Sequence, residues 1–272
     1  MSDLGAAAKR EGDNLAGAKQ LGWLARAGLV ARGLVYLIIG ILALELVFGE
    51  GGKAANQQDA LKTIADQSFG RILLIAVAIG LAGYALWRLT RAAVGHGAEQ
   101  RDSGLDRLAA LGSGIAYGIL CVTAVEIVLG AGTGSGTPRE TTGGVLGWTG
   151  GTVLVAIAGA VLIAVAAYQA YKGLGRKFLD DARTDEMSEG VEKGYTALGV
   201  FGHLARAVVF ALIGYGLIKA AVDYNPKEAI GLDGALRQLA DASYGPALLA
   251  LVAAGLAGFA IYSITDARFR KV

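Results

Sequence analysis

Two stretches of 28 residues decide the fold: ALKTIADQSFGRILLIAVAIGLAGYALW at 60–87 and ALRQLADASYGPALLALVAAGLAGFAIY at 235–262. Fifteen of the 28 aligned positions are identical, including Asp66 with Asp241 and Ser68 with Ser243. A general bias towards alanine and glycine cannot produce matched aspartate and serine positions. The match therefore indicates that one supersecondary unit is used more than once along the chain.

A second set of matched positions extends the repeat to the whole chain. It begins with Arg32-Gly33-x-x-Tyr36-x-x-x-Gly40, which aligns with Arg206-Ala207-x-x-Phe210-x-x-x-Gly214 and, in the middle copy, with Ser113-Gly114-x-x-Tyr117-x-x-x-Cys121. The middle copy also carries Tyr168-x-x-Tyr171-Lys172 where the first carries Tyr84-x-x-Trp87-Arg88. The sequence therefore predicts three tandem copies of one two-helix hairpin.

The composition is that of a membrane protein. Of the 272 residues, 54% are hydrophobic, 42 are glycine and only 18% are charged, with a mean hydropathy of +0.50. This argues against a soluble enzyme and against disorder, and three prolines without a glycine period exclude collagen. The net charge of +2 is too small to suggest a nucleic-acid partner. The single cysteine, Cys121, offers no disulfide within the chain and no cysteine-based metal cluster.

Six apolar runs are long enough to cross a hydrocarbon layer. They lie near residues 28–49, 70–94, 107–130, 150–172, 200–222 and 245–264. Residues 1–26 have no apolar core, so no cleavable signal peptide is expected. The predicted fold is all-α, with six transmembrane helices in three hairpins. Because each copy holds two spans, all three enter the membrane in the same orientation, which predicts approximate threefold symmetry about the membrane normal.

The predicted organisation is a polar tail at 1–20 and three membrane repeats at 21–98, 99–180 and 181–272, the last with a short tail. An amphipathic stretch with Ala60, Leu61 and Ile64 on one face precedes the second span of the first repeat, and Leu236 and Leu239 repeat it in the third. It predicts a helix on the outer surface, either capping the bundle or lying at the interface. Lysine and arginine are distributed 17 to 7 in favour of the side with the termini, which predicts that both termini are cytoplasmic.

These motifs resemble the bacterial family catalogued as domain of unknown function 1206. The resemblance rests on Arg32-Gly33-x-x-Tyr36, Ala60-Leu61…Phe69-Gly70-Arg71-x-Leu73-Leu74 and Tyr84-x-x-Trp87-Arg88, and it covers about residues 20 to 268. The middle copy departs most, with Ser113 in place of arginine and no recognisable lead-in. The resemblance implies a six-span protein of three repeats in the bacterial cytoplasmic membrane. It implies no activity and no site residues.

Two layers of polar residues occupy matched depths in the three copies. The inner layer is Arg32, Ser113 and Arg206, followed one turn further in by Tyr36, Tyr117 and Phe210; the outer layer is Glu45, Glu126 and Lys219. At 100° per residue Glu45 points almost opposite to Arg32, so one continuous polar pore lined by both layers is disfavoured. The face with Arg32, Tyr36 and Gly40 is expected to pack inward.

Each layer has two interpretations. Arg32 and Arg206 either extend to the cytoplasmic headgroups or bind an anionic lipid headgroup or small anion, together with Tyr36, Ser113 and Tyr117. Glu45, Glu126 and Lys219 form a structural ion pair or lie solvated at the outer interface, or they handle a cation or proton. An interfacial belt is expected from the residues Tyr84, Trp87, Arg88, Tyr168, Tyr171, Lys172 and Tyr262.

The sequence contains no catalytic, metal-ligating or phosphate-loop motif, so we expect a protein that is not an enzyme and has no cofactor or metal. The glycine-rich run 130–136 is interpreted as a flexible linker. Two functions remain. The favoured one is binding or permeation of a small ion or lipid within the bundle; the alternative is a non-catalytic accessory or scaffold subunit with a protein partner or a second copy.

Overall fold

The computed structural model describes residues 2–48, 57–94, 104–130 and 138–271, and over these residues it consists of helices without a β-strand. Within these ranges six helices are long and apolar enough to span a membrane, which confirms the all-α, six-span prediction. They are α1 (Ser2–Val47), α3 (Gly70–Val94), α4 (Gly104–Val128), α6 (Gly151–Leu174), α7 (Glu189–Val222) and α9 (Gly245–Phe269). The predicted polar tail is helical and continuous with the first span. The expected boundary at 98/99 and residues 131–136 of the expected linker lie outside the described residues.

In each repeat one short helix precedes the second span. These helices are α2 (Gln57–Ala65), α5 (Pro138–Leu146) and α8 (Leu232–Ala240). Buried Ala60, Leu61 and Ile64 hold α2 against α1, α3 and α4, and the apolar face of α8 packs on α7 and α9. The amphipathic stretches therefore cap the bundle. The middle copy has such a helix too, although its sequence PRETTGGVL carries too few apolar residues to reveal it.

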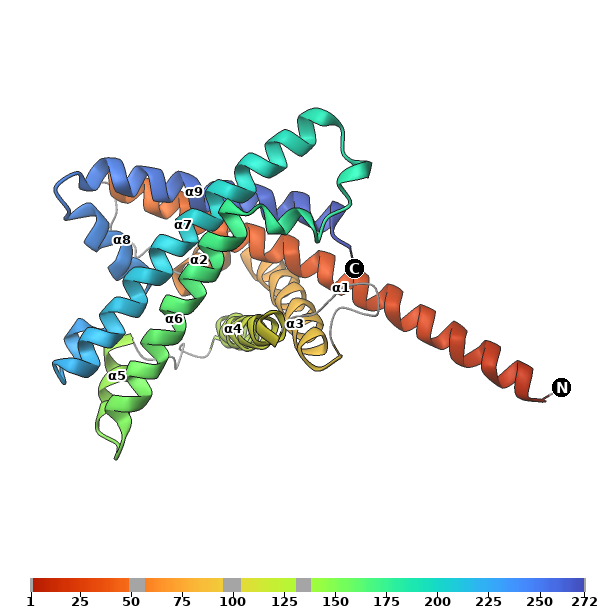
Figure 1. The fold of residues 1–272 in the computed structure, drawn as a ribbon, viewed down its shortest axis with the longest axis horizontal. Coiled ribbons are helices and arrows are strands. Elements are labelled where there is room, and N and C mark those ends of the chain that lie inside the picture. The colour runs from red at the N-terminus through yellow and green to blue at the C-terminus, as the bar shows by residue number, and fades with distance from the viewer. Residues whose placement is uncertain (1, 49–56, 95–103, 131–137, 272) are drawn as a thin grey trace.

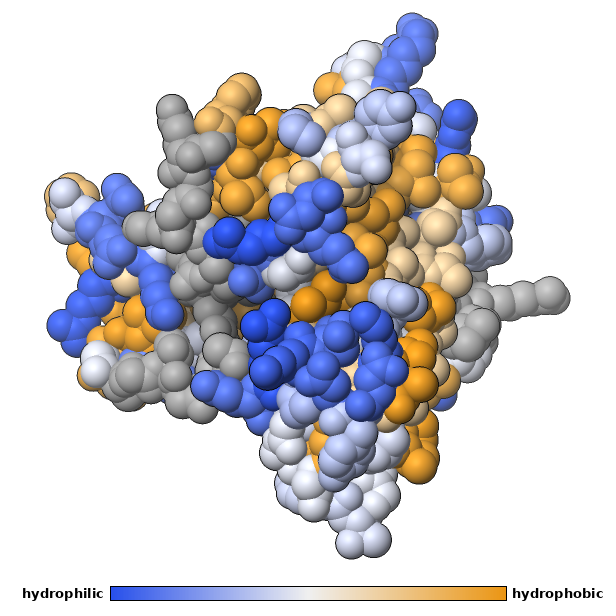
Figure 2. Space-filling view, turned by 90° about the vertical axis from the view of Figure 1, so that its left-hand side faces the viewer, coloured by the Kyte–Doolittle hydropathy of each residue, from blue (hydrophilic) through white to orange (hydrophobic). Residues whose placement is uncertain are grey.

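The six spans pack in the order α4, α3, α1, α9, α7, α6. Both termini lie at one end of the bundle, here called the terminal end, and α2, α5 and α8 lie at the opposite, capping end (Figure 1). Viewed from the side that carries α8, hydrophilic side chains gather near the middle of the face and hydrophobic ones flank them (Figure 2). The arrangement suits helices whose apolar sides contact lipid.

The ring of helices is open at one place. A closed threefold ring would have one interface within each repeat and one between consecutive repeats. The described structure contains α1 on α3, α7 on α9 and all three interfaces between repeats, namely α3 on α4, α6 on α7 and α9 on α1. The two spans of the second repeat, α4 and α6, do not pack along each other (Figure 1). Threefold symmetry is therefore not confirmed.

The interfaces between repeats nevertheless share one register. A Cβ atom on Gly33 would lie 2.6 Å from the Ile264 side chain, and one on Gly114, its equivalent, would lie 2.8 Å from Leu89. Two helical turns deeper, the Cys121 Sγ atom donates to the Ala78 carbonyl at 3.4 Å. Small residues at these positions let the helices of neighbouring repeats approach closely.

Small residues spaced four positions apart along the spans play mixed roles. Gly114 lies in a close approach, whereas a Cβ on Gly118 would have no neighbour within 4 Å and Ala254 is exposed. Closer helix approaches occur elsewhere, at Gly28 and Gly255.

Candidate functional site

The inner polar layer converges at the terminal end of the bundle. Arg32 in α1 is only 5% exposed and lies against α9 and α3. Its Nε atom donates to Ser263 Oγ at 2.7 Å, its Nη1 atom donates to Tyr84 Oη at 2.8 Å, and its Nη2 atom lies 3.8 Å from the Asp266 carboxylate. Arg32 therefore does not extend to the headgroups, and its donors are committed to the protein.

Asp266 is the centre of a buried network. Its side chain is 0% exposed and accepts a hydrogen bond from Tyr195 Oη at 2.8 Å and from Arg270 Nη1 at 3.1 Å. Because Tyr195 lies in α7 and Arg270 follows α9, the carboxylate joins two helices of the third repeat to Arg32 of the first. A buried carboxylate is stable only with such partners.

The network continues to the second repeat through Asp181, in the segment between η1 (Lys177–Leu179) and η2 (Thr184–Glu186). Its Oδ2 atom accepts from Arg270 Nη2 at 3.0 Å and from Lys172 Nζ at 2.9 Å. Burial alone would raise the pKa of the Asp181 carboxyl, but Arg270 and Lys172 hold this pKa well below its ordinary value. The carboxylate therefore stays charged, and through Arg270 and Asp266 it connects Lys172 of the second repeat with Arg32 of the first.

Arg206 differs from Arg32 in having no carboxylate partner among the described residues. Its guanidinium lies 4.4 Å from the Phe259 ring, 5.3 Å from Tyr36 and 5.3 Å from Phe210. With its amide oxygen towards Arg206, Gln169 accepts from Nη1 at 2.9 Å and from Nη2 at 3.1 Å. Neutral rings and one amide thus contact the guanidinium of this partly exposed side chain, and no carboxylate in the described ranges offsets its charge.

The contact of Gln169 also fixes the register of α6. Ser263 of the third repeat contacts Arg32 of the first, and Gln169 of the second contacts Arg206 of the third. Gln169 of the second repeat is therefore equivalent to Ser263 of the third repeat and to Arg88 of the first. Tyr168 is therefore equivalent to Trp87 of the first repeat. The alignment suggested by the aromatic residues paired Tyr168 with Tyr84, three residues away from this register.

The missing arginine of the middle copy has a counterpart on the neighbouring helix. Ser113 occupies the place of Arg32, and Arg88 in α3 occupies the place of Ser263 in the facing helix. Arg88 donates from Nε to Tyr84 Oη at 3.1 Å, so Arg32 and Arg88 share one phenol oxygen. Each interface between repeats thus carries one arginine at this depth.

Tyr36 and Tyr117 lie inside the bundle, as expected for the inner face. Tyr36 packs edge-on against Phe259 at 5.0 Å, and Tyr117 packs edge-on against Tyr84 at 4.7 Å. Tyr117 is also close enough to interact electrostatically with Arg32 and Arg206. The structure therefore brings Arg32, Tyr36, Tyr117 and Arg206 together, while Ser113 has no hydrogen bond among the described contacts.

The outer layer does not form a site. The Lys219 Nζ atom lies 2.9 Å from the carboxylate of Glu228, the last residue of η3 (Pro226–Glu228), and both side chains are partly exposed. Glu45 is exposed and Glu126 is partly exposed, and neither forms an ion pair in the described part of the chain. The interpretation of these three residues as one ion-handling group gains no support from the geometry.

Several aromatic residues expected in an interfacial belt are buried instead. Tyr84, Trp87 and Tyr262 are 1%, 5% and 2% exposed, so the belt interpretation is wrong for them, whereas Tyr171 is 59% exposed. His203 stacks on Phe178 at 5.2 Å and its Nδ1 atom lies 2.7 Å from the Gly199 carbonyl oxygen. It is a hydrogen-bonded histidine of the helix interface.

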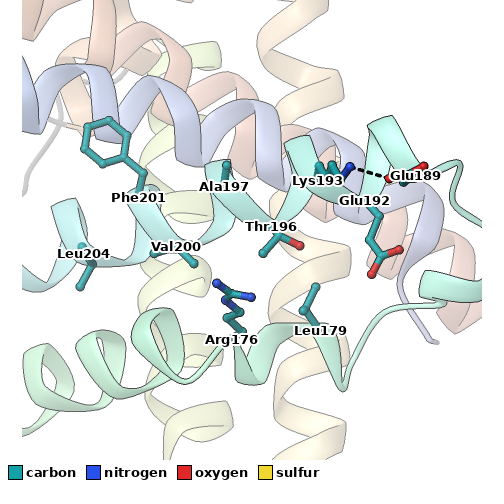
Figure 3. Close-up of a pocket in the computed structure, with 10 residues that line it drawn as sticks. All are labelled: Arg176, Leu179, Glu189, Glu192, Lys193, Thr196, Ala197, Val200, Phe201 and Leu204. Atoms are coloured by element: carbon teal, nitrogen blue, oxygen red, sulfur yellow. Dashed lines mark hydrogen bonds and ion pairs between the residues drawn. The ribbon is translucent and has the colours of Figure 1, made fainter.

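A separate groove of about 610 Å³ lies between α7 and the segment after α6 (Figure 3). Its inner part is apolar, with Val200, Phe201 and Leu204. Its outer part contains two cations and two carboxylates, Arg176, Lys193, Glu189 and Glu192, of which Lys193 pairs with Glu189. Because these charges balance, the groove is a weaker anion site than Arg206. Within the described residues no cluster of histidine, cysteine and carboxylates could hold a metal.

Sequence reasoning missed the acidic side of this site. It placed the end of the sixth span at residue 264, so Asp266 counted as part of the tail, and Asp181 counted as part of a loop. The signal that could have revealed Asp266 is its position one turn after Tyr262 in a helix that continues to Phe269.

Comparison with known proteins gives a family but no activity. The family described as Domain of Unknown Function (DUF1206) matches three times, at residues 27–95, 108–176 and 201–270. The chain is 33% identical over 243 residues to the uncharacterized protein YxxB of Bacillus subtilis (strain 168), covering 88% of this chain and 87% of that one. No solved structure matches the chain.

Proposed function

Because the chain belongs to the DUF1206 family of three-repeat membrane proteins, to which no activity is attached, we propose from its geometry that it binds an anionic headgroup at Arg206. The observation that carries the proposal is the uncompensated charge of Arg206. The ligand class is a phosphate-bearing anion, in lipid-bound or free form.

The charge balance around Arg206 supports an anion. Among the described residues, the buried network and Arg206 beside it hold five cations and two carboxylates: Arg32, Arg88, Lys172, Arg206 and Arg270 against Asp181 and Asp266. A charge inside a membrane span is costly unless it is paired. The two carboxylates lie beside Arg32, Arg270 and Lys172, so an external anion is needed most at Arg206.

The depth of the layer suits a lipid headgroup. Gln169 lies five residues before the end of α6 and Ser263 six residues before the end of α9, which places the layer about 8–9 Å inside the helix ends. With the lysine and arginine bias, we further propose that the terminal end is cytoplasmic in a bacterial inner membrane, where anionic lipids attract basic side chains. The protein then acts by binding and not by catalysis.

The test compares Arg206→Gln with Arg237→Gln, which removes the same charge from an exposed residue at the capping end. Each protein is placed in phosphatidylcholine nanodiscs with 10–20% phosphatidylglycerol (roughly the share of anionic lipid that gives a clear surface potential), and retained lipid is counted by native mass spectrometry. Loss of charge-assisted hydrogen bonds predicts about 10–100-fold weaker retention of phosphatidylglycerol for Arg206→Gln alone.

Two further outcomes separate the ligand sources. If inorganic phosphate displaces the lipid from the wild-type protein, the site takes the free anion as well. Equal retention by both variants and the wild-type protein contradicts the proposed function.

A scaffold role is the second candidate, and the exposure of α4 and α6 favours it. Only 28% and 22% of their apolar windows are buried, against 61% for α1. Such faces contact lipid, or a helix of another protein. Crosslinking in native membranes followed by isolation in mild detergent tests this role, and recovery of a monomer without a crosslinked partner contradicts it.

A further inference from the structure

The strongest unexplained feature is the missing interface between α4 and α6. In the first repeat the two spans meet through small residues: a Cβ on Gly80 would lie 2.8 Å from Ala31 Cβ, and one on Gly28 would lie 2.2 Å from Tyr84 Cβ. The third repeat uses equivalent positions, where a Cβ on Gly255 would lie 2.4 Å from Ala205 Cβ. Two of the three hairpins therefore close in the same way.

The equivalent positions of the second repeat are open. In the register that the packing of α6 fixes, Gly112 replaces Ala31 and Val161 replaces Gly80. Gly112 is exposed and an added Cβ would meet nothing within 4 Å, and Val161 is 55% exposed. Leu108, one turn before Gly112, is 65% exposed.

The residues of the open interface redistribute the bulk of a closed one. Ala31 facing Gly80 becomes Gly112 facing Val161, so the glycine moves to the other helix and this pair becomes larger. Gly28 facing Tyr84 becomes Ala109 facing Val165, so this pair becomes smaller and the bulk of the two pairs together changes little. Cores tolerate simultaneous substitutions that keep their total volume. The second hairpin can therefore close in the manner of the other two.

Arg206 lies near both helices that flank the missing interface, here called the opening. Gln169, which holds the Arg206 guanidinium, comes from α6. Tyr117, which lies within electrostatic range of Arg206, comes from α4. The two helices that flank the opening thus each contribute a side chain to the surroundings of Arg206. The side chains that α4 and α6 expose here, such as Leu108 and Val161, are apolar, so an entering molecule needs an apolar part as well as a charge.

We propose that α4 and α6 form a lateral gate, which closes through contact of Gly112 with Val161 and, when open, admits an anionic phospholipid from the bilayer to Arg206. The identity of the entering molecule rests on the proposed function, whereas the closing of the gate does not. In the arrangement described here the gate is open.

Cysteine crosslinking tests the closing. In a Cys121→Ala background, the gate pair is Gly112→Cys with Val161→Cys, and the control pair is Gly112→Cys with Ile163→Cys, because Ile163 lies two residues further on and packs against Gly214 of α7. In membranes treated with copper phenanthroline, we expect an intramolecular disulfide in the gate pair only, since a disulfide requires Cβ atoms about 3.5–4.5 Å apart. No disulfide in either pair, equal disulfide formation in both, or a disulfide between two copies overturns the closing of the gate.

Lipid exchange tests the entrance. The gate pair is reconstituted in nanodiscs of phosphatidylcholine and phosphatidylglycerol, oxidised or reduced, and exchange of bound phosphatidylglycerol with labelled lipid is followed by native mass spectrometry. The oxidised protein should exchange at least about tenfold more slowly, because a covalent closure removes the route. Equal exchange rates overturn the entrance. Absence of any bound phosphatidylglycerol in the reduced protein refutes the proposed function and with it the entrance, while the crosslinking result still decides whether the gate closes.

Discussion

The substitution Asp266→Asn should destabilise the protein more than any other single change that preserves side-chain shape. Asp266 is fully buried and provides the carboxylate for Arg270 at 3.1 Å and for Arg32 at 3.8 Å, and it also accepts from Tyr195. An asparagine side chain offers one acceptor and one donor, so at least one of these donors loses its partner. Both guanidiniums also lose a counter-charge in a region that excludes water.

The expected loss of unfolding free energy follows from the interactions that each substitution removes. Breaking a buried ion pair by removing one partner costs about 3–5 kcal/mol. Tyr195→Phe removes a single hydrogen bond to a charged group and should cost about 1.5–3 kcal/mol. Asp241→Asn changes an exposed carboxylate in the turn before α9 and should stay within about 0.5 kcal/mol of the wild-type protein.

The assay is the free energy of unfolding, measured by titration with sodium dodecyl sulfate in mixed micelles and followed by far-ultraviolet circular dichroism. The expected order of destabilisation is Asp266→Asn, then Tyr195→Phe, then Asp241→Asn. If Asp266→Asn unfolds within about 0.5 kcal/mol of Asp241→Asn, the buried network does not stabilise the packing of the repeats and the reasoning is refuted.

Two further predictions concern stability. Gly202→Ala places a Cβ 2.6 Å from Phe259 Cβ and should destabilise the protein by about 1–3 kcal/mol in the same assay. The control Gly118→Ala adds a Cβ with nothing within 4 Å and should be neutral or stabilising by up to about 1 kcal/mol. An equal loss of stability in both variants contradicts the close approach at Gly202. The second concerns pH: because the pKa of Asp181 is lowered in the folded protein, its contribution is fully present above the ordinary aspartate pKa of about 3.9 and is lost progressively as the pH falls from there towards the lower pKa of the folded state. The stability difference between wild type and Asp181→Asn should therefore shrink between about pH 5 and pH 3, and a difference that is constant over this range contradicts the pairing with Arg270 and Lys172.

The repeat pattern predicted the architecture because it constrains every copy at once. Matched pairs such as Asp66 with Asp241 establish hairpins, and the length of each apolar run establishes a span. The same pattern could not predict that α4 and α6 stay apart, since the interface residues of the second repeat, Gly112 and Val161, look as suitable for packing as those of the first. Whether a pair of apolar helix faces meets depends on competing contacts with lipid, which also presents an apolar surface.

The site was predicted in part. Reading the helices at 100° per residue correctly placed Arg32 and Tyr36 on the inner face, with Glu45 elsewhere. The partners of Arg32 could not be predicted, because they come from α3 and α9 and depend on the order of helices in the ring. The register of α6 was missed for a related reason: alignment by tyrosines favoured Tyr168 with Tyr84, whereas packing pairs Gln169 with Arg206.

The arginines explain why one interface of three is suited to a ligand. Each interface between repeats carries one guanidinium at the same depth: Arg32 facing Ser263, Arg88 in the place facing Ser113, and Arg206 facing Gln169. Asp266 lies within reach of Arg32, and Arg88 shares the Tyr84 hydroxyl with Arg32, so these two belong to one network with a carboxylate. Arg206 has aromatic rings and an amide in place of that carboxylate. It also lies at the interface whose helix α6 borders the open side of the ring, which is why the proposed function assigns the anion to this arginine.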